Sequence, residues 1–282
     1  MGRPTLLAPR SARSFDPRVT ALGNWLHYAD KRVIVSGCHS GIGHAAARQL
    51  VELDAEVHGL DWKGCDLDLH SFTRLDLRDP ATIDSALAGL TGSFDALFNC
   101  AGMPPGAPPL DVVKANYLGP RHLTEGLLPQ MAQGSAIVNI SSNGGMGWRG
   151  HLPELLELDA AHCFADGQRW CEAHPDLVAE GYRFSKEAII VWTMASASRN
   201  ITRGIRTNCT MPGAVQTPML VEIEKVTPSA AIDVVAHPIG RRSSADEQAE
   251  CLLFLNSPRA SYVNGATLPI DGGFMSAMAT RR

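Results

Sequence analysis

Short apolar runs alternate along the chain with longer segments of helical character. The apolar runs lack strict in-and-out alternation, so we expect them to be strands buried on both faces. The predicted strands are 32–36, 56–60, 73–77, 96–99, 136–140, 205–209 and 266–270, and the predicted helices between them are 43–53, 81–90, 110–131, 181–199 and 245–255. Strands separated by helices form a parallel sheet, and right-handed crossovers place helices on both faces. The pattern therefore predicts a single-domain α/β fold, a Rossmann-type doubly wound parallel sheet.

Residues 1–30 lie outside this pattern. The first 15 residues contain three arginines and no acid, as organellar targeting peptides do, but Pro4 and Pro9 prevent the amphipathic helix that such a peptide needs. We therefore expect an N-terminal arm over residues 1–30. Residues 31–282 contain no linker, repeat or low-complexity tract and are predicted to form the one folded domain.

Composition narrows the possible partners. The 25 basic and 29 acidic side chains give a net charge of −4, so the chain has no bulk attraction for nucleic acid or for anionic membrane surfaces. No apolar run reaches the roughly 18 residues of a membrane span. The seven cysteines are scattered without a paired framework, which indicates reduced thiols and predicts a cytoplasmic protein.

A glycine-rich loop, Ser36–Gly43, stands where the first strand meets the first helix. Glycines there let the backbone approach a pyrophosphate, and the helix amino end adds free N–H groups. The second strand ends at Asp61, whose carboxylate can accept hydrogen bonds from ribose hydroxyls and repels a 2′-phosphate. Ser40 occupies the place where a basic residue would favour NADP, although Lys63 lies nearby. These residues favour NAD over NADP.

Further motifs follow the loop in a fixed order: Asp76-Leu77, Asn99-Cys-Ala-Gly102, Asn116, Ile140-Ser-Ser142, Tyr182-x3-Lys186, Pro212-Gly-Ala-Val-Gln-Thr-Pro218 and Asp271-Gly-Gly273. Together they resemble the short-chain dehydrogenase/reductase family over residues 31–274. In the glycine loop Ser36 stands where the family usually has Thr, and Cys100 stands in place of a second Asn. Neither difference removes a group that carries the chemistry.

The resemblance implies four catalytic residues, Asn116, Ser142, Tyr182 and Lys186. Tyr182 and Lys186 are spaced i, i+4 and share one helix face. The Lys186 ammonium and an oxidised nicotinamide ring would both lower the pKa of Tyr182, which could then exchange a proton with the substrate oxygen. Ser142 would hold that oxygen, with Ser141 as the less favoured choice, and Asn116 would anchor a water molecule in a proton relay from Lys186.

The same resemblance implies a cofactor site along one cleft. Its predicted residues are Gly37, His39, Ser40, Gly41, Ile42, Gly43, Asp61, Asp76, Leu77, Asn99, Ala101, Gly102, Tyr182, Lys186, Pro212, Gly213, Val215 and Thr217. Of these, Asp76 and Leu77 would flank the adenine, and Pro212 to Thr217 would contact the nicotinamide. Residues 219–237 would then form a lid over the substrate.

Forty positions separate Ser142 from Tyr182, against about a dozen in most of the family. This helical insertion, residues 143–181, resembles the branch that contains coniferyl-alcohol dehydrogenases and bacterial 3α-hydroxysteroid dehydrogenase/carbonyl reductases. The resemblance implies oxidation of an aromatic, coniferyl-type alcohol, with a steroid or other cyclic secondary alcohol as the alternative. The expected ligand is small and neutral, and the expected assembly is a homodimer or homotetramer.

Other interpretations carry less weight. A non-catalytic NAD-sensing protein would usually lack the Tyr or the Lys, and a sugar-nucleotide epimerase or dehydratase would need a larger C-terminal lobe than the chain provides after Pro212. The insertion also contains a histidine- and cysteine-rich group: His151, His162, Cys163, Cys171 and His174. Its spacing is irregular, so we predict packing and no metal ligand. Trp148 and Trp170 are candidates for lining an aromatic-friendly pocket, and Trp192 is assigned to the core or to a subunit interface.

Overall fold

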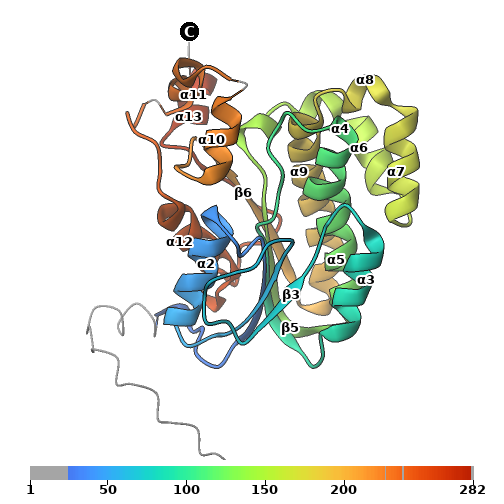
Figure 1. Cartoon of the computed structure of the whole chain (residues 1–282), viewed down its shortest axis with the longest axis vertical. Helices are drawn as coiled ribbons and strands as arrows, with labels where there is room; N and C mark the ends of the chain where they lie inside the picture. The colour runs from blue at the N-terminus through green and yellow to red at the C-terminus, as the bar shows by residue number, and fades with distance from the viewer. Residues whose placement is uncertain (1–24, 226, 237, 281–282) are drawn as a thin grey trace, which may run out of the picture.

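Seven parallel strands form one sheet at the centre of the computed structural model, which describes residues 25–225, 227–236 and 238–280 (Figure 1). The strands are β1 (Arg32–Ser36), β2 (Glu56–Asp61), β3 (Ser71–Arg74), β4 (Phe94–Asn99), β5 (Met131–Ile140), β6 (Arg206–Pro212) and β7 (Thr267–Ile270). Their order is β3-β2-β1-β4-β5-β6-β7. The chain reverses its direction of travel through the sheet between β1 and β4, and this switch point is where doubly wound sheets bind ligands.

Helices cover both faces of the sheet, as the sequence predicted. Figure 1 shows α2 (Gly41–Glu52) and α12 (Ala245–Asn256) on one face, and α3 (Pro80–Gly89), α5 (Gly119–Leu127) and α9 (Gly181–Asn200) on the other. The single-domain, Rossmann-type fold is therefore confirmed.

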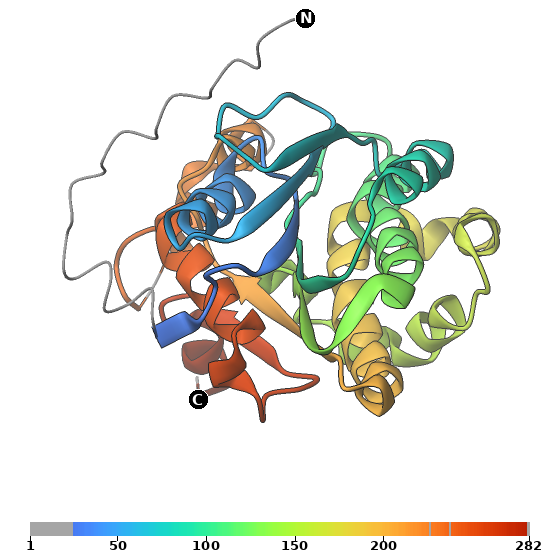
Figure 2. The ribbon, with the colours of Figure 1, turned by 90° about the horizontal axis from the view of Figure 1, so that it is seen from below.

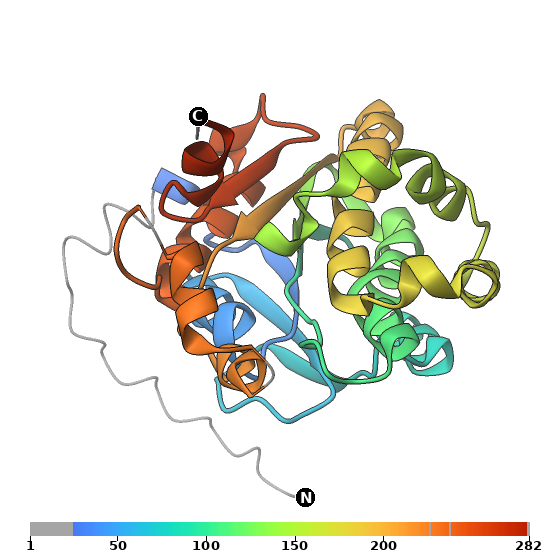
Figure 3. The ribbon, with the colours of Figure 1, turned by 90° about the horizontal axis from the view of Figure 1, so that it is seen from above.

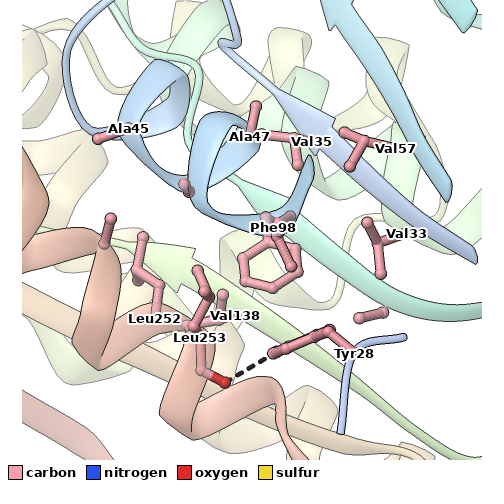
Figure 4. Close-up of a cluster of buried hydrophobic side chains, with 14 of the residues drawn as sticks. Tyr28, Val33, Val35, Ala45, Ala47, Val57, Phe98, Val138, Leu252 and Leu253 are labelled. Atoms are coloured by element: carbon pink, nitrogen blue, oxygen red, sulfur yellow. Dashed lines mark hydrogen bonds between the residues drawn. The ribbon is translucent and has the colours of Figure 1, made fainter. Parts of the chain in front are cut away.

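Small side chains bring α2 and α12 close to the sheet. Ala47 of α2 and Leu253 of α12 belong to the same buried cluster as Val35 and Phe98 from the central strands (Figure 4). Tyr28 extends this cluster, because its hydroxyl donates a hydrogen bond of 2.8 Å to the Leu253 carbonyl. Burying apolar side chains contributes roughly 25 cal/mol per Å² to folding, and this cluster fixes the helix that begins at the glycine loop.

Residues 1–24 of the predicted arm lie outside the described residues. The described part of the arm packs against the domain: the Trp25 ring stacks on Phe254 with centroids 6.3 Å apart, and Tyr28 is only 2% exposed. Within the arm as predicted, Tyr28 thus belongs to the core and Leu26 packs against it, while Trp25 remains about half exposed.

Several elements differ from the prediction. β5 begins at Met131 rather than at residue 136, and β6 extends to Pro212 rather than to residue 209. The third strand ends at Arg74 rather than at residue 77, because its ladder with β2 stops where β2 stops, at the pair Asp61 and Arg74. The single predicted helix over 110–131 is divided into α4 (Pro109–Val113), a π-helical turn (Lys114–Leu118), α5 and a short 3₁₀ turn. Apolar periodicity continues across these breaks, and so it did not reveal them.

The insertion is helical, as expected. After two 3₁₀ turns it forms α6 (Leu152–Asp159), α7 (Phe164–Ala173) and α8 (Pro175–Val178), which lie against α4 and α9 on the side away from the sheet (Figures 1 and 3). Arg121 of α5 fastens it by donating hydrogen bonds to the carbonyls of Leu158 (3.2 Å) and Ala161 (2.6 Å). The insertion therefore covers helix surface and does not enlarge the sheet.

Three short helices complete the described fold. α10 (Pro218–Glu224) and α11 (Ser229–Val235) follow β6, and α13 (Phe274–Thr280) follows β7. Figure 2, in which the ribbon is seen from below, shows the C-terminal segment on the same side of the molecule as α12. In the part of the chain that the structure describes, no helix combines the length and the apolar character needed to cross a bilayer.

Candidate active site

A cavity of about 420 Å³ lies at the carboxyl ends of the central strands. Its walls come from the loops after β1, β2 and β4, from the end of β5, from α9 and from α10. Seventeen of the predicted site residues line it: Gly37, His39, Ser40, Gly41, Ile42, Asp61, Asp76, Leu77, Ala101, Gly102, Ser142, Tyr182, Lys186, Pro212, Gly213, Val215 and Thr217. Segments far apart in the sequence thus meet at the switch point of the sheet.

The glycine loop requires glycine for two different reasons. Gly37 has a φ of +80°, and a Cβ there would lie 2.5 Å from the Ala101 nitrogen. Gly43 does not line the cavity; a Cβ there would lie 2.2 Å from the Gly37 carbonyl oxygen. Gly43 therefore lets α2 pack against the loop, while Gly37 lets the loop turn beneath a ligand.

Asp61 stands at one end of the cavity, at the carboxyl end of β2. Its carboxylate accepts hydrogen bonds from the backbone N–H groups of His39 (3.0 Å) and Lys63 (2.9 Å). The Lys63 ammonium lies 4.8 Å from the centre of the Trp62 ring, and both side chains line the cavity. Asp61 is thus fixed in position, with a negative charge where a ribose would lie.

Asp76 and Leu77 lie at the same end of the cavity. The Asp76 carboxylate is paired with Arg78 at 2.6 Å, and this hydrogen bond lowers the pKa of Asp76. Arg78 itself lines the cavity. The charges of Asp76 and Arg78 therefore neutralise each other. The other charged side chains at this end of the cavity are Asp61 and Lys63.

Ser142 and Tyr182 face each other at the other end of the cavity. Ser142 follows β5, and its hydroxyl accepts a hydrogen bond of 3.1 Å from the Gly144 nitrogen. Ser141 also lines the cavity, but its hydroxyl donates to the Lys186 carbonyl at 2.7 Å and is only 2% exposed. The geometry agrees with the choice of Ser142 over Ser141 for holding a substrate oxygen.

The pKa of Tyr182 is raised by burial, and the hydrogen bond with Ser142 lowers it only in part. This differs from the expectation that Lys186 lowers it. Burial also lowers the pKa of Lys186, to about 8, so its positive charge is itself weakened. The chain alone therefore keeps Tyr182 protonated, and a further positive charge is needed to favour the tyrosinate.

Lys186 is held one turn after Tyr182 on α9. Its ammonium donates a hydrogen bond of 2.9 Å to the Ile140 carbonyl at the end of β5, and it lies 5.6 Å from the centre of the Tyr182 ring. Lys186 is 5% exposed. A buried cation beside a phenol is the arrangement expected of a pair that exchanges protons.

Asn116 lies behind the cavity wall, in the π-helical turn. Its side-chain carbonyl accepts from the Met103 nitrogen at 2.6 Å, and its amide donates to the Met103 carbonyl and to the Ser185 hydroxyl, each at 3.1 Å. Asn116 thus connects the loop after β4 with α9. π-Helical turns are frequent at functional sites, and this one brings Asn116 beside Gly102 and Lys186.

Three predictions need correction. Asn99 does not line the cavity, because its amide donates to Thr124 and Asn139 in the buried layer behind it. Neither Trp148 nor Trp170 lines the cavity. The Trp170 ring stacks on His174, with centroids 3.9 Å apart. Trp192 is 1% exposed and lies in the core, as one of its two assignments proposed.

The sequence did not reveal the apolar end of the cavity. Met103, Pro104, Met219, Leu220 and Ile223 line it, the last three from α10. Single apolar residues in loops and short helices give no pattern that distinguishes lining from packing. The only indication in the sequence was that three of them, Met219, Leu220 and Ile223, fall within the predicted lid.

The histidines and cysteines of the insertion do not meet. His151 is paired with Glu187 of α9 at 2.6 Å, and His174 contacts the Trp170 carbonyl at 2.7 Å. Cys171 is buried in the core, and Cys163 is exposed. Pairing accounts for His151 and His174 and packing for Cys171, while His162 and Cys163 lie at exposed positions.

Comparison with known proteins agrees with this geometry. A family profile described as short chain dehydrogenase matches residues 31–152, and one described as Enoyl-(Acyl carrier protein) reductase matches residues 176–275. The chain is 36% identical over 252 residues to a coniferyl-alcohol dehydrogenase of Pseudomonas sp. strain HR199, covering 89% of this chain and 99% of the relative. It is 31% identical over 264 residues to a 3-alpha-hydroxysteroid dehydrogenase/carbonyl reductase of Comamonas testosteroni, covering 87% and 97%.

Solved structures show the same likeness. The 3-alpha-hydroxysteroid dehydrogenase of Pseudomonas sp. B-0831, complexed with NADH, superposes with a TM-score of 0.75 at 30% identity over 88% of this chain and 98% of its own. Levodione reductase superposes with a TM-score of 0.71 at 27% identity, covering 89% and 100%.

A doubly wound sheet with a glycine loop, an acidic strand end and a buried Tyr–Lys pair defines an oxidoreductase of the dinucleotide-binding class. Within that class, the chain belongs to the short-chain dehydrogenase/reductase family. Interconversion of alcohols and carbonyl compounds with NAD(P) is the general activity that this membership supports.

Proposed function

We propose that the protein is an NAD-dependent dehydrogenase that interconverts an alcohol and its aldehyde or ketone, most favourably a coniferyl-type aromatic alcohol. The observation that carries the proposal is that Ser142, Tyr182 and Lys186 line the same cavity as the glycine loop and Asp61. One ligand can therefore extend from the acidic strand end to the reacting group.

The walls of the cavity fit a dinucleotide. Gly37 and Gly41 have positive φ values and bring bare backbone to the amino end of α2, where a pyrophosphate would be held. Asp61 would accept from the ribose hydroxyls, and Thr217 and Val215 would contact the nicotinamide end. The Asp61 carboxylate favours NAD, because a 2′-phosphate would meet its negative charge.

The chain's own residues handle the proton. NAD, when bound, would supply the hydride acceptor and a further positive charge beside Tyr182. The Ser142 hydroxyl would hold the substrate oxygen, and Tyr182 would accept the hydroxyl proton as the alcohol is oxidised, or donate it in the opposite direction. Lys186 stabilises the tyrosinate, and Asn116 holds the loop that contains Gly102 against this group.

The apolar end of the cavity supports a neutral substrate. Met103, Met219 and Ile223 line it, while the charged lining residues other than Lys186 lie toward Asp61 or at Asp76 and Arg78. Thioether and aliphatic side chains suit a planar ring. The likeness to a coniferyl-alcohol dehydrogenase favours a phenylpropanoid alcohol. The likeness to two 3-alpha-hydroxysteroid dehydrogenases makes a hydroxysteroid or other cyclic alcohol the second candidate.

Replacing Tyr182 by Phe tests the mechanism. With NAD and coniferyl alcohol, we expect wild-type turnover and a loss of roughly 10²–10⁴-fold in kcat for Tyr182→Phe, because only the proton-transfer group is removed. NADH formation measured by absorbance at several alcohol concentrations gives kcat and KM, and NAD binding by fluorescence should remain. Turnover of the variant within a few-fold of wild type would disprove the role of Tyr182.

The substrate is tested in parallel with a hydroxysteroid and with benzylic alcohols. Preference for the steroid would keep the mechanism and select the second candidate. We also retain as predictions a homodimer or homotetramer, checked by sedimentation equilibrium, and a cytoplasmic location, checked by cell fractionation.

A further inference from the structure

Three side chains with metal-binding atoms meet at the amino ends of β2 and β3, at the edge of the sheet opposite the active-site cavity. Glu56 Oε1 lies 3.0 Å from His58 Nε2 and 3.4 Å from His70 Nε2. All three ligand atoms lie within 4.8 Å of one another. Within the described residues, no other three His, Cys, Asp or Glu side chains bring their ligand atoms this close.

The strands themselves create this arrangement. Glu56 and His58 are two residues apart on β2, so their side chains leave the same face. His70 directly precedes β3, and its backbone N–H donates a hydrogen bond of 3.0 Å to the Val57 carbonyl. The ladder therefore holds the three side chains together before any ion arrives.

Neighbouring residues orient the ligands. His58 Nδ1 lies 2.8 Å from the Ser71 hydroxyl, which leaves Nε2 directed toward Glu56. Arg32 Nε donates to Glu56 Oε1 at 2.6 Å, and the carbonyls of Thr91 and Ser93 hold the guanidinium in place. Hydrogen bonds of this kind, one layer out from the ligand atoms, are typical of metal sites in proteins.

The site opens into an acidic cavity. Glu56 and His70 line this cavity together with Asp30, Asp54 and Asp68, and among the residues that the structure describes no Lys or Arg lines it. The three aspartates concentrate cations at the mouth of the site and offset the charge of Arg32. The cavity also gives water access to the side of the cluster that the protein leaves open.

We propose that Glu56, His58 and His70 bind a divalent transition-metal ion, best matched by Zn²⁺. Zn²⁺ binds imidazole and carboxylate at about 2.0–2.2 Å with tetrahedral geometry, which spaces the ligand atoms roughly 3.3–3.5 Å apart. The two distances from Glu56 are close to this spacing. Rotation of the half-exposed His70 side chain would shorten the third distance, between the Nε2 atoms of His58 and His70. Water fills the fourth position. With the ion on His58 Nε2, the single N–H of the neutral imidazole would reside on Nδ1, where the Ser71 hydroxyl oxygen can accept it, so no proton has to leave this ring.

The expected consequence is structural. The ion would link β2 to the residue before β3 and so close the intervening loop, residues 62–70, at its far end. Trp62 and Lys63 of that loop line the active-site cavity. The proposal does not depend on the substrate or on the proton-transfer role of Tyr182.

The test is titration of the full-length protein, freed of metal with a chelator, by ZnCl₂ in a calorimeter and in thermal unfolding. We expect one equivalent to bind and the Tm to rise, since an ion that binds only the folded state stabilises it. His70→Gln removes one ligand at a half-exposed position and should weaken binding by at least roughly tenfold. His162→Gln, at an exposed position in the insertion, is the matched control and should bind as the wild type does.

A third variant keeps the test independent of folding defects. His70→Cys offers Zn²⁺ and Co²⁺ a thiolate in place of the imidazole, so binding should return, with a sulfur-to-cobalt charge-transfer band that the wild type lacks. Absence of binding by the wild type, or undiminished binding by His70→Gln, would overturn the proposal.

Discussion

Burial determines the chemistry of single residues in this protein. Lys186 lines the cavity but is only 5% exposed, and burial lowers its pKa from 10.5 to about 8. Burial moves the pKa of Tyr182 in the opposite direction, upward, because the charged form that burial disfavours is here the negative tyrosinate. The pKa values of the two groups therefore move apart, downward for Lys186 and upward for Tyr182. Proton exchange near neutral pH would thus need the positive charge of a bound nicotinamide to lower the pKa of Tyr182.

This burial has a cost in stability that a substitution should recover. Below about pH 8 Lys186 is charged in both the folded and the unfolded chain, and folding must bury the charge. Between about pH 8 and 10.5 the unfolded state holds more protons, so stability rises with pH. We expect Lys186→Met to be inactive yet more stable than wild type at pH 6.5, by up to about 3 kcal/mol, with the gain shrinking as the pH approaches 10.

Urea unfolding of both proteins at pH 6.5 and 9.5 measures this difference. Lys225→Met is the control: its ammonium is exposed and paired with Glu222, so no gain is expected there. A Lys186→Met variant that is less stable than wild type at both pH values would contradict the prediction.

The sequence identified these residues but not their protonation behaviour. Tyr182, Lys186, Ser142 and Asn116 could be recognised because their types and spacing form an ordered set. The pKa of Lys186 could not be predicted, because it depends first on burial and then on neighbours such as Cys100 and Cys209, which only the fold brings together. The side-chain partners of Asn99 were hidden for the same reason.

At the scale of elements, α10 and α11 stand apart from the main core. Leu220 and Ile232 form a small apolar cluster of their own with Ala214 and Ile223. Arg242 links the two helices through Glu224 (2.8 Å) and Asp233 (2.9 Å). Few buried contacts and one ionic connection are the properties of a segment that can open locally, as the predicted lid over residues 219–237 requires.

We expect Arg242→Ala to loosen this lid without disturbing the reacting groups. KM for the alcohol should rise several-fold, while the pH dependence of kcat, which reports on Tyr182 and Lys186, keeps its shape. Steady-state kinetics over a range of pH measures both quantities. The neighbouring Arg241→Ala is the control, because Arg241 pairs with Glu247 of α12 instead. Equal changes in the two variants would show that α10 and α11 do not act as a lid.

Most elements could be predicted because their patterns are local. Each observed strand overlaps a predicted one. Strands β1, β2, β4 and β6 are largely buried, as their apolar runs predicted, whereas the edge strands β3 and β7 are only partly buried, contrary to the expectation of burial on both faces. The end of β3 is set by its partner β2, and the π-helical turn at Lys114–Leu118 is set by packing against α9. The local sequence therefore indicates neither the end of β3 nor the π-helical turn.

At the scale of the whole molecule, a bound dinucleotide would add contacts between two halves that already meet through the sheet and through the packing of α2 on α12. The cavity has walls from the loop after β2, on one side of the switch point, and from β6 and α10 on the other. A ligand that contacts both stabilises the folded chain by mass action.

Thermal unfolding with NAD and with NADP tests this. NAD at about 100 times its Kd should add about 2.7 kcal/mol and raise the Tm by several degrees. NADP at the same concentration should give a smaller rise, because its phosphate meets Asp61. Tyr182→Phe should keep the NAD shift, since Tyr182 acts on the substrate oxygen. A larger rise with NADP would show that Lys63 outweighs Asp61.

The separation of α10 from the main core affects how substrate specificity can change as proteins of this fold diverge. The dinucleotide end of the cavity rests on Gly37 and Gly43, where an added Cβ would lie within 2.5 Å of backbone atoms, so we expect substitutions there to destabilise the fold. Met219 and Ile223 contribute little to the large buried clusters, so exchanges at these positions can accumulate as neutral variation that reshapes the pocket. Dehydrogenases of this design can therefore acquire new alcohols while their cofactor chemistry stays unchanged, and libraries at positions 219 and 223 are the natural starting point for redirecting this one.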